Sequence, residues 1–287
     1  MTKFKKLLTK NMDLGSLWTG STSASYLLLN PLKYNNCQCL EINDLWNALH
    51  STFNTVLHHQ VDIDILNEIT DKPISSWPTF SKEEFRLALA NCNNSSAPGP
   101  DKLLWSHLKT ILKDDDCLNV IISIANACIK VGYWPSHFKR STMVIIPKPN
   151  KKSYDSSKAF RPIALLNIVS KLIEKVIGEC LQFNMALNNF IHPSQLSGLK
   201  FKSTIDAEVA LTHIIRTGWV KNLSMSILAF NIVQFFPSLN HQLLSLIMKK
   251  AGFDNWIVSF FTNYLVDRKT NYYLLPFIYI LEKHLKN

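Results

Sequence analysis

The sequence predicts an α+β protein in which helices outnumber strands. Several stretches place apolar residues at the three- and four-residue spacing of an amphipathic helix, and some begin with a helix-capping signal. Two short apolar runs are typical of strands instead: residues 143–146, which end at Pro147, and the run that starts at Met225 and stops at Asn231. With 287 residues, 47% of them hydrophobic, the chain can bury a large core and form about one to two domains.

The charge balance favours a polyanionic partner. The chain has 31 Lys and Arg against 21 Asp and Glu, a net charge of +10 that suits nucleic acid but also occurs in proteins that never bind it. The six cysteines show no C-x-x-C spacing, so we expect reduced thiols in an intracellular protein, nuclear or cytoplasmic. Neither a signal peptide nor a run of about 18 apolar residues is present, so no membrane partner is expected. Dinucleotide-binding and P-loop motifs have no match.

The helical pattern is strongest in the middle of the chain. Residues 167–183 have a buried stripe made of Ile168, Val169, Leu172, Ile173, Val176, Ile177 and Cys180. A capping box at Ser81 and Glu84 begins another helix, whose buried stripe is Phe85, Ala88, Leu89 and Cys92. Further helices are expected at residues 45–57, 116–131, 241–251 and 256–266, and from Ser203 or Thr204 onward.

The segment at residues 97–101, with the sequence APGPD, is expected to be a rigid turn. Each proline fixes its own φ and keeps the preceding residue extended, while Gly99 tolerates conformations closed to other residues. The simplest interpretation is a plain loop between two helices.

Cations gather at both ends of the strand predicted at residues 143–146. They are Lys139, Arg140, Lys148, Lys151 and Lys152. Such a strand is suited to binding phosphate. An equally good interpretation is that these charges keep an exposed edge strand soluble. Arg161 lies just before Pro162 in an extended segment, and a guanidinium can bind two phosphate oxygens at once where an ammonium cannot.

A second basic segment precedes the helix expected at Ser203. Its Gly-containing loop carries Lys200 and Lys202, and Asp206 lies in the first turn of the helix. A basic loop that leads into a helix N-terminus can cradle a nucleic-acid backbone.

The apolar run from Met225 is expected to be a central strand that delivers Asn231 to the edge of a site. An amide forms hydrogen bonds but lacks the negative charge that holds a magnesium ion. Taken alone, the same pattern is also explained by a strand that ends at Asn231, followed by Phe235, Phe236 and Leu239 as core residues.

Five motifs follow one another in order between residues 89 and 270: APGPDKLLWSHLK, VIIPKPNKK, FRPIALLNIVSKLIEKVI, QLSGLKFKSTIDA and LAFNIVQFFPSLNH. Together they resemble the reverse transcriptase domain of LINE-type (non-LTR) retrotransposons, most closely the versions in fungal elements. The resemblance implies a partial right-hand polymerase fold: a linker or helical extension at residues 1–80, fingers and an incomplete palm at 81–270, and a remnant of a palm helix at 271–287.

The resemblance also implies roles for single residues. Lys148 and Arg161 match positions that hold the incoming nucleotide, and Phe236 matches the aromatic residue that excludes a ribose 2′-hydroxyl. Gln195, Lys202 and Ser203 match template-handling positions, and Lys151, Lys152 and Lys200 add basic charge for nucleic acid. Asn231 stands where the family has its first metal-binding aspartate.

The sequence departs from the family at the metal site. Besides Asn231, the family's Gly-Gln-Gly-Ser motif is missing after Leu274, as if deleted, and no pair of adjacent aspartates follows. We therefore expect a truncated, degenerate reverse transcriptase that is inactive, holds no Mg²⁺ productively and needs no cofactor beyond a nucleotide. Its expected partner is an RNA or DNA template-primer. The alternatives are a non-catalytic nucleic-acid-binding module that uses the same cations, and an unrelated helical scaffold.

Overall fold

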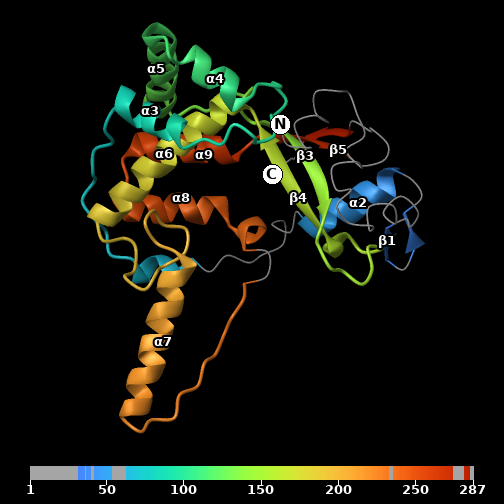
Figure 1. Ribbon diagram of the computed structural model, residues 1–287. Helices are drawn as coiled ribbons and strands as arrows, with labels where there is room; N and C mark the ends of the chain where they lie inside the picture. The colour runs from blue at the N-terminus through green and yellow to red at the C-terminus, as the bar shows by residue number, and fades with distance from the viewer. Residues whose placement is uncertain are drawn as a thin grey trace. The chain divides into compact units, whose positions relative to one another are not determined.

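The computed structural model describes residues 32–35, 37–39, 42–53, 63–232, 235–273 and 281–284. The chain divides into two compact units, one formed by Met1–Ile173 with Gln234–Asn287 and the other by Glu174–Val233. Both helices and a sheet are present, in agreement with the predicted α+β class (Figure 1). The predicted division at residues 80 and 270 stays a prediction.

The first unit contains a four-stranded sheet with the strand order β4-β3-β5-β6. Strand β3 (Arg140–Pro147) pairs antiparallel with β4 (Phe160–Leu166), which places Ile146 opposite Arg161. On its other side β3 pairs in parallel with β5 (Lys269–Tyr273). Because β3 has a partner on each side, the interpretation of its cations as charge around an edge strand is wrong.

The expectation of a palm-helix remnant at residues 271–287 is wrong for Leu281–His284, which form strand β6. These four residues pair antiparallel with β5, with Thr270 opposite Lys283. The outer edge of β5 offers backbone donors and acceptors that need partners, and an added strand satisfies them. The predicted deletion after Leu274 falls on residues 274–280, which lie outside the described residues.

The N-terminal part of the chain attaches to the sheet and to the loop between β3 and β4. It comprises β1 (Lys33–Tyr34), β2 (Cys37–Gln38) and α2 (Ile42–Phe53), which begins before the predicted residue 45. The amide of Lys33 donates to the carbonyl of Asp155 at 2.6 Å. The hydroxyls of Thr52 and Ser157 are 2.6 Å apart, and Ser157 begins the short helix η5 (Ser157–Ala159).

The first unit also contains further helices (Figure 1). They are η4 (Asp64–Glu68), α3 (Lys82–Ala90), α4 (Trp105–Ile111), α5 (Asp115–Val131), η6 (Phe236–Ser238), α8 (His241–Lys250) and α9 (Asn255–Leu265). The capping box at Ser81 and the buried stripe of α3 are confirmed. Helix α4 was not predicted, because it has seven residues and begins after Leu104, whose side chain cannot cap a helix.

Helix α6 (Ile168–Leu187) begins in the first unit and ends in the second. Five residues of its predicted stripe are buried, while Val169 and Cys180 are partly exposed. Although α6 is 20 residues long, no helix in the described ranges has both the length and the apolar character needed to cross a membrane.

Helix α7 (Thr204–Val220) lies in the second unit and starts after Ser203 as predicted. Only Gly218 is buried in this helix, and its large apolar side chains, among them Val209, Ile214 and Trp219, are exposed. Few of its apolar residues therefore contribute to a core.

The strand predicted from Met225 is wrong for residues 225–232. These residues have no strand pairing in the structure, and their apolar side chains are exposed, with Phe230 at 84%. A strand forms only where a neighbour supplies backbone partners, and the described sheet contains no strand that pairs with this segment.

The loop at residues 97–101 does more than connect two helices. The carboxylate of Asp101 accepts a hydrogen bond from the amide of Ile168 at 2.7 Å, at the first residue of α6. The Asn167 side chain accepts from the Asp101 amide at 3.2 Å and donates to the His137 carbonyl at 3.0 Å. A Cβ on Gly99 would lie 2.1 Å from the carbonyl oxygen of Leu166, so only glycine fits there. The loop thereby anchors the junction between β4 and α6.

We expect Asp101→Ala to lower the free energy of unfolding by about 1 to 3 kcal/mol, because the Ile168 amide loses its acceptor in a part-buried site. Denaturant unfolding of the full chain measures this change. Asp116→Ala is the matched control, since Asp116 is an exposed residue in the first turn of α5. It should cost less than about 1 kcal/mol, through the helix dipole alone. Equal losses in the two variants would contradict the role of Asp101.

Candidate nucleic-acid interface

Lys148 closes the base of the loop that joins β3 to β4. Its amide donates to the carbonyl of Ala159 at 2.8 Å, which extends the pairing of the two strands. Its amino group donates to the carbonyl of Lys158 at 2.8 Å, and the Tyr154 hydroxyl donates to the Lys148 carbonyl at 2.7 Å. Lys148 forms no ion pair with a carboxylate among the residues that the structure describes.

The other cations of this hairpin face solvent. Lys151, Lys152, Lys158 and Arg161 are exposed, and no ion pair involves them among the described residues. The one carboxylate of the loop is occupied: Asp155 accepts from Ser153 and forms an ion pair with Lys33 at 3.3 Å. Hydrogen bonds from Ser153 and then Lys33 lower the pKa of Asp155 below its ordinary value. The hairpin therefore presents surplus positive charge.

The strand register brings the two predicted nucleotide-binding residues to the same end of the hairpin. Arg161 lies opposite Ile146, and Lys148 follows two residues later. Lys151 and Lys152 belong to the loop at this end, so four of the predicted residues form one group. The sequence interpretation missed Lys158, although its position three residues before Arg161 in a basic segment was a usable signal.

The predicted residues of the second unit lie in a loop and at a helix start. Gln195 and Lys202 are exposed, and the Gln195 side chain donates to the carbonyl of Ser197 at 2.9 Å. Lys200 is engaged in an ion pair with Glu179 at 3.2 Å, so its charge is compensated. Ser203 caps α7: its hydroxyl accepts from the amide of Asp206 at 3.3 Å.

Asn231 lies in the extended segment of the second unit, while Phe236 lies in the first unit at η6. Asn231 is exposed. Phe235 and Phe236 form an edge-to-face ring pair at 5.3 Å and are 46% and 80% exposed, so the interpretation of these rings as core residues is wrong.

The described residues do not fit a two-metal centre. No group of three or more His, Cys, Asp or Glu side chains in the described ranges could hold a metal ion. Asn231 supplies a neutral amide, whereas Mg²⁺ is usually bound through carboxylates. No catalytic step can be assigned through such an ion with these residues.

Comparison with known proteins reveals distant relatives. The chain is 27% identical over 168 residues to a probable RNA-directed DNA polymerase from transposon BS of Drosophila melanogaster, across 58% of this chain and 18% of that protein. It is 31% identical over 95 residues to the RNA-directed DNA polymerase from mobile element jockey of Drosophila funebris, across 33% of this chain and 10% of that protein. This chain is related to RNA-directed DNA polymerases of mobile elements.

The chain spans less than a fifth of each of these polymerases. A match to the polymerase from transposon X-element of Drosophila melanogaster, 28% identical over 114 residues, covers 40% of this chain and 12% of the relative. No family model matches the chain. The relatives confirm the predicted origin among polymerases of mobile elements, while the likeness to fungal elements stays a prediction.

We expect the start of α7 to weaken in acid. The hydrogen bond from the Ser203 hydroxyl to the Asp206 carboxylate, followed by the one from the Ser203 amide, lowers the pKa of Asp206 below 3.8. A lowered pKa means that the carboxylate stabilises the folded helix start above pH 3.8, and that this contribution is lost as the pH falls through the lower folded value. An NMR titration of the Ser203 and Asp206 amides measures the effect. In Asp206→Asn this transition should be absent, and an unchanged transition would contradict the assignment.

Proposed function

We propose that this chain is a degenerate fragment of a retrotransposon RNA-directed DNA polymerase with no polymerase activity. The observation that supports the loss of activity is Asn231, which stands at the position of a metal-binding aspartate in the motif LAFNIVQFFPSLNH. The relationship to RNA-directed DNA polymerases of mobile elements supports descent from such a polymerase.

Polymerisation by two metal ions depends on negative charge that this chain lacks at the matching position. Carboxylates must hold two cations about 4 Å apart so that the charges on the attacking and leaving oxygens are stabilised. Removing one well-placed electrostatic group commonly lowers the rate by about 10² to 10³.

We expect no primer extension by the full chain on an RNA or DNA template with Mg²⁺ or Mn²⁺, in a gel assay that includes an active reverse transcriptase as positive control. Asn231→Asp should also remain inactive, because a single restored carboxylate cannot hold two metal ions. Extension above background by the unchanged chain would overturn the proposed loss of activity.

Non-catalytic binding of nucleic acid is the second function, and the β3–β4 hairpin favours it. Lys151, Lys152 and Arg161 are exposed and lack carboxylate partners in the described structure. Cations that neutralise phosphates release condensed counterions, so the affinity falls as the salt concentration rises. Arg161 adds a planar guanidinium that can bind two phosphate oxygens. Loss of catalysis and retention of binding are compatible.

We expect the full chain to bind single-stranded RNA or DNA. The logarithm of the affinity should fall linearly as the logarithm of the salt concentration rises. Lys151→Gln with Lys152→Gln should reduce the size of this slope by about 1.4, at about 0.7 for each lost phosphate contact. Fluorescence anisotropy at several salt concentrations measures the slope.

The matched control is Lys113→Gln with Lys130→Gln, which removes the same charge from exposed lysines around α5. This control should leave the slope nearly unchanged. Equal effects of the two double variants, or no binding at low salt, would contradict a role for the hairpin.

A further inference from the structure

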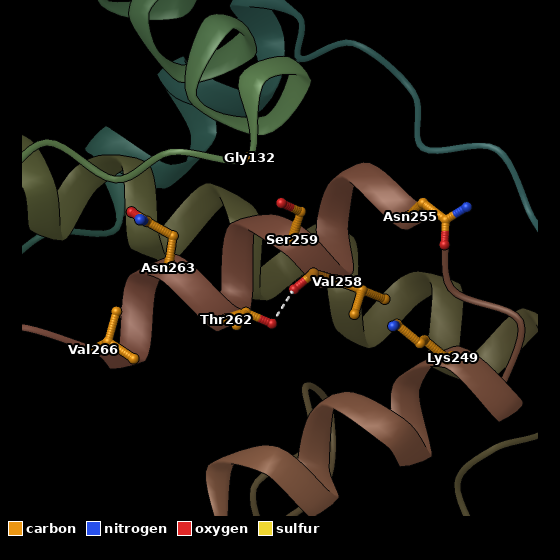
Figure 2. Close-up of a pocket in the computed structure, with 8 residues that line it drawn as sticks. All are labelled: Gly132, Lys249, Asn255, Val258, Ser259, Thr262, Asn263 and Val266. Atoms are coloured by element: carbon orange, nitrogen blue, oxygen red, sulfur yellow. Dashed lines mark hydrogen bonds between the residues drawn. The ribbon is translucent and has the colours of Figure 1, made fainter. Parts of the chain in front are cut away.

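A pocket of about 560 Å³ lies along α9, between the end of α8 and the turn that follows α5 (Figure 2). Its polar lining includes Lys249, Asn255, Ser259 and Asn263, and its apolar lining includes Val258 and Val266. All of these residues belong to the first unit. The volume is within the range of pockets that hold small-molecule ligands, about 300 to 1,000 Å³.

Helical spacing brings the polar groups of the pocket together. Asn255, Ser259 and Asn263 follow one another at intervals of four residues, so they form one stripe along α9. Beside this stripe, Phe260 is buried and contacts the fully buried Trp134 with ring centroids 5.5 Å apart. Packing of this aromatic face therefore holds the polar stripe in place.

The orientation of the Asn263 amide is determined by its neighbour. The backbone N–H of Trp134 donates to Asn263 Oδ1 at 2.7 Å, and only the oxygen of an amide can accept this bond. The Asn263 NH₂ group is thus left as a donor, and Figure 2 shows the side chain projecting from α9 beside the turn at Gly132.

Lys249 supplies the positive charge of the pocket. Its neighbour Lys250 forms an ion pair with Asp71 at 4.0 Å and donates to the carbonyl of Ile69, whereas Lys249 has no ion pair in the described part of the chain. Figure 2 shows the Lys249 amine directed toward α9 near Val258. None of the described residues that line the pocket is a carboxylate, so none of them neutralises this charge.

We infer that this pocket binds a phosphate ester of nucleotide size. A phosphate group combines negative charge with several acceptor oxygens, which match one ammonium, the amides of Asn255 and Asn263, and the Ser259 hydroxyl. Val266, which is partly exposed, offers an apolar surface for the organic part of the ligand. The simpler interpretation is that Lys249 only stabilises the C-terminal end of α8 in a solvent-filled groove. The inference does not depend on the proposed function, because the pocket and the β3–β4 hairpin share no residues.

The test is a titration of the full chain with uridine 5′-monophosphate, inorganic phosphate and a short oligothymidylate, followed by amide NMR. Saturable shifts centred on residues 255–266 are expected. Tighter binding of the oligonucleotide would identify a nucleic-acid backbone as the ligand, and tighter binding of the monophosphate would identify a free nucleotide. No saturable shift with any of the three probes would overturn the inference.

Asn263→Asp distinguishes binding from a structural role. Aspartate keeps the acceptor for the Trp134 amide but replaces the NH₂ donor by negative charge, so binding should weaken by about 10-fold or more. The matched control is Asn126→Asp, because Asn126 Oδ1 likewise accepts a backbone N–H, from Phe80 at 2.9 Å, and lies outside the pocket. Lys249→Gln should weaken binding in the same way. Equal affinities in Asn263→Asp, Lys249→Gln and the control would overturn the inference.

Discussion

The pairing of β3 on both sides is the constraint on which the first unit depends. This strand connects three parts of the chain: β4, which follows it directly, β5 at residues 269–273, and the N-terminal part, which meets the loop at Asp155. The far end of β4 is held in turn by Asp101 and Asn167 at the start of α6. These contacts join the basic hairpin to β5, to the N-terminal part and to the start of α6.

The distribution of carboxylates explains why positive charge is left over. Several acidic residues have local partners: Asp115 pairs with Lys82 and Arg86, Glu179 with Lys200, and Asp155 with Lys33. Others cap helices, as Asp114 does at α5, where hydrogen bonds from Cys117 lower its pKa. These carboxylates serve local structure, and no ion pair with the lysines or the arginine of the hairpin is found in the described part of the chain. This arrangement suits a polyanion and does not suit a divalent cation.

In the second unit, local sequence signals form a helix whose apolar side chains remain exposed. Helix α7 begins with a complete capping box, yet residues such as Ile214 and Trp219 are exposed, as is Phe230 in the segment that follows. Apolar surface left in water forgoes about 25 cal/mol per Å² of stabilisation, and large contiguous patches of this kind commonly mark interaction sites. Local signals are enough to start helix α7. Its apolar side chains become buried only where another surface packs against them.

The sequence by itself determined the elements whose signals are local. The capping box at Ser81, the helix start at Ser203 and the strand before Pro147 depend on neighbouring residues, and the structure confirms them. It also confirms five of the seven residues in the predicted stripe of α6. Tertiary structure decided what depends on distant partners. The segment before Asn231 has a strand pattern but no pairing, and residues 281–284, expected in a helix remnant, became a strand because the edge of β5 was available. Likewise, Asp101 meets Ile168 only because the chain folds back across 67 residues, a contact that no local pattern encodes.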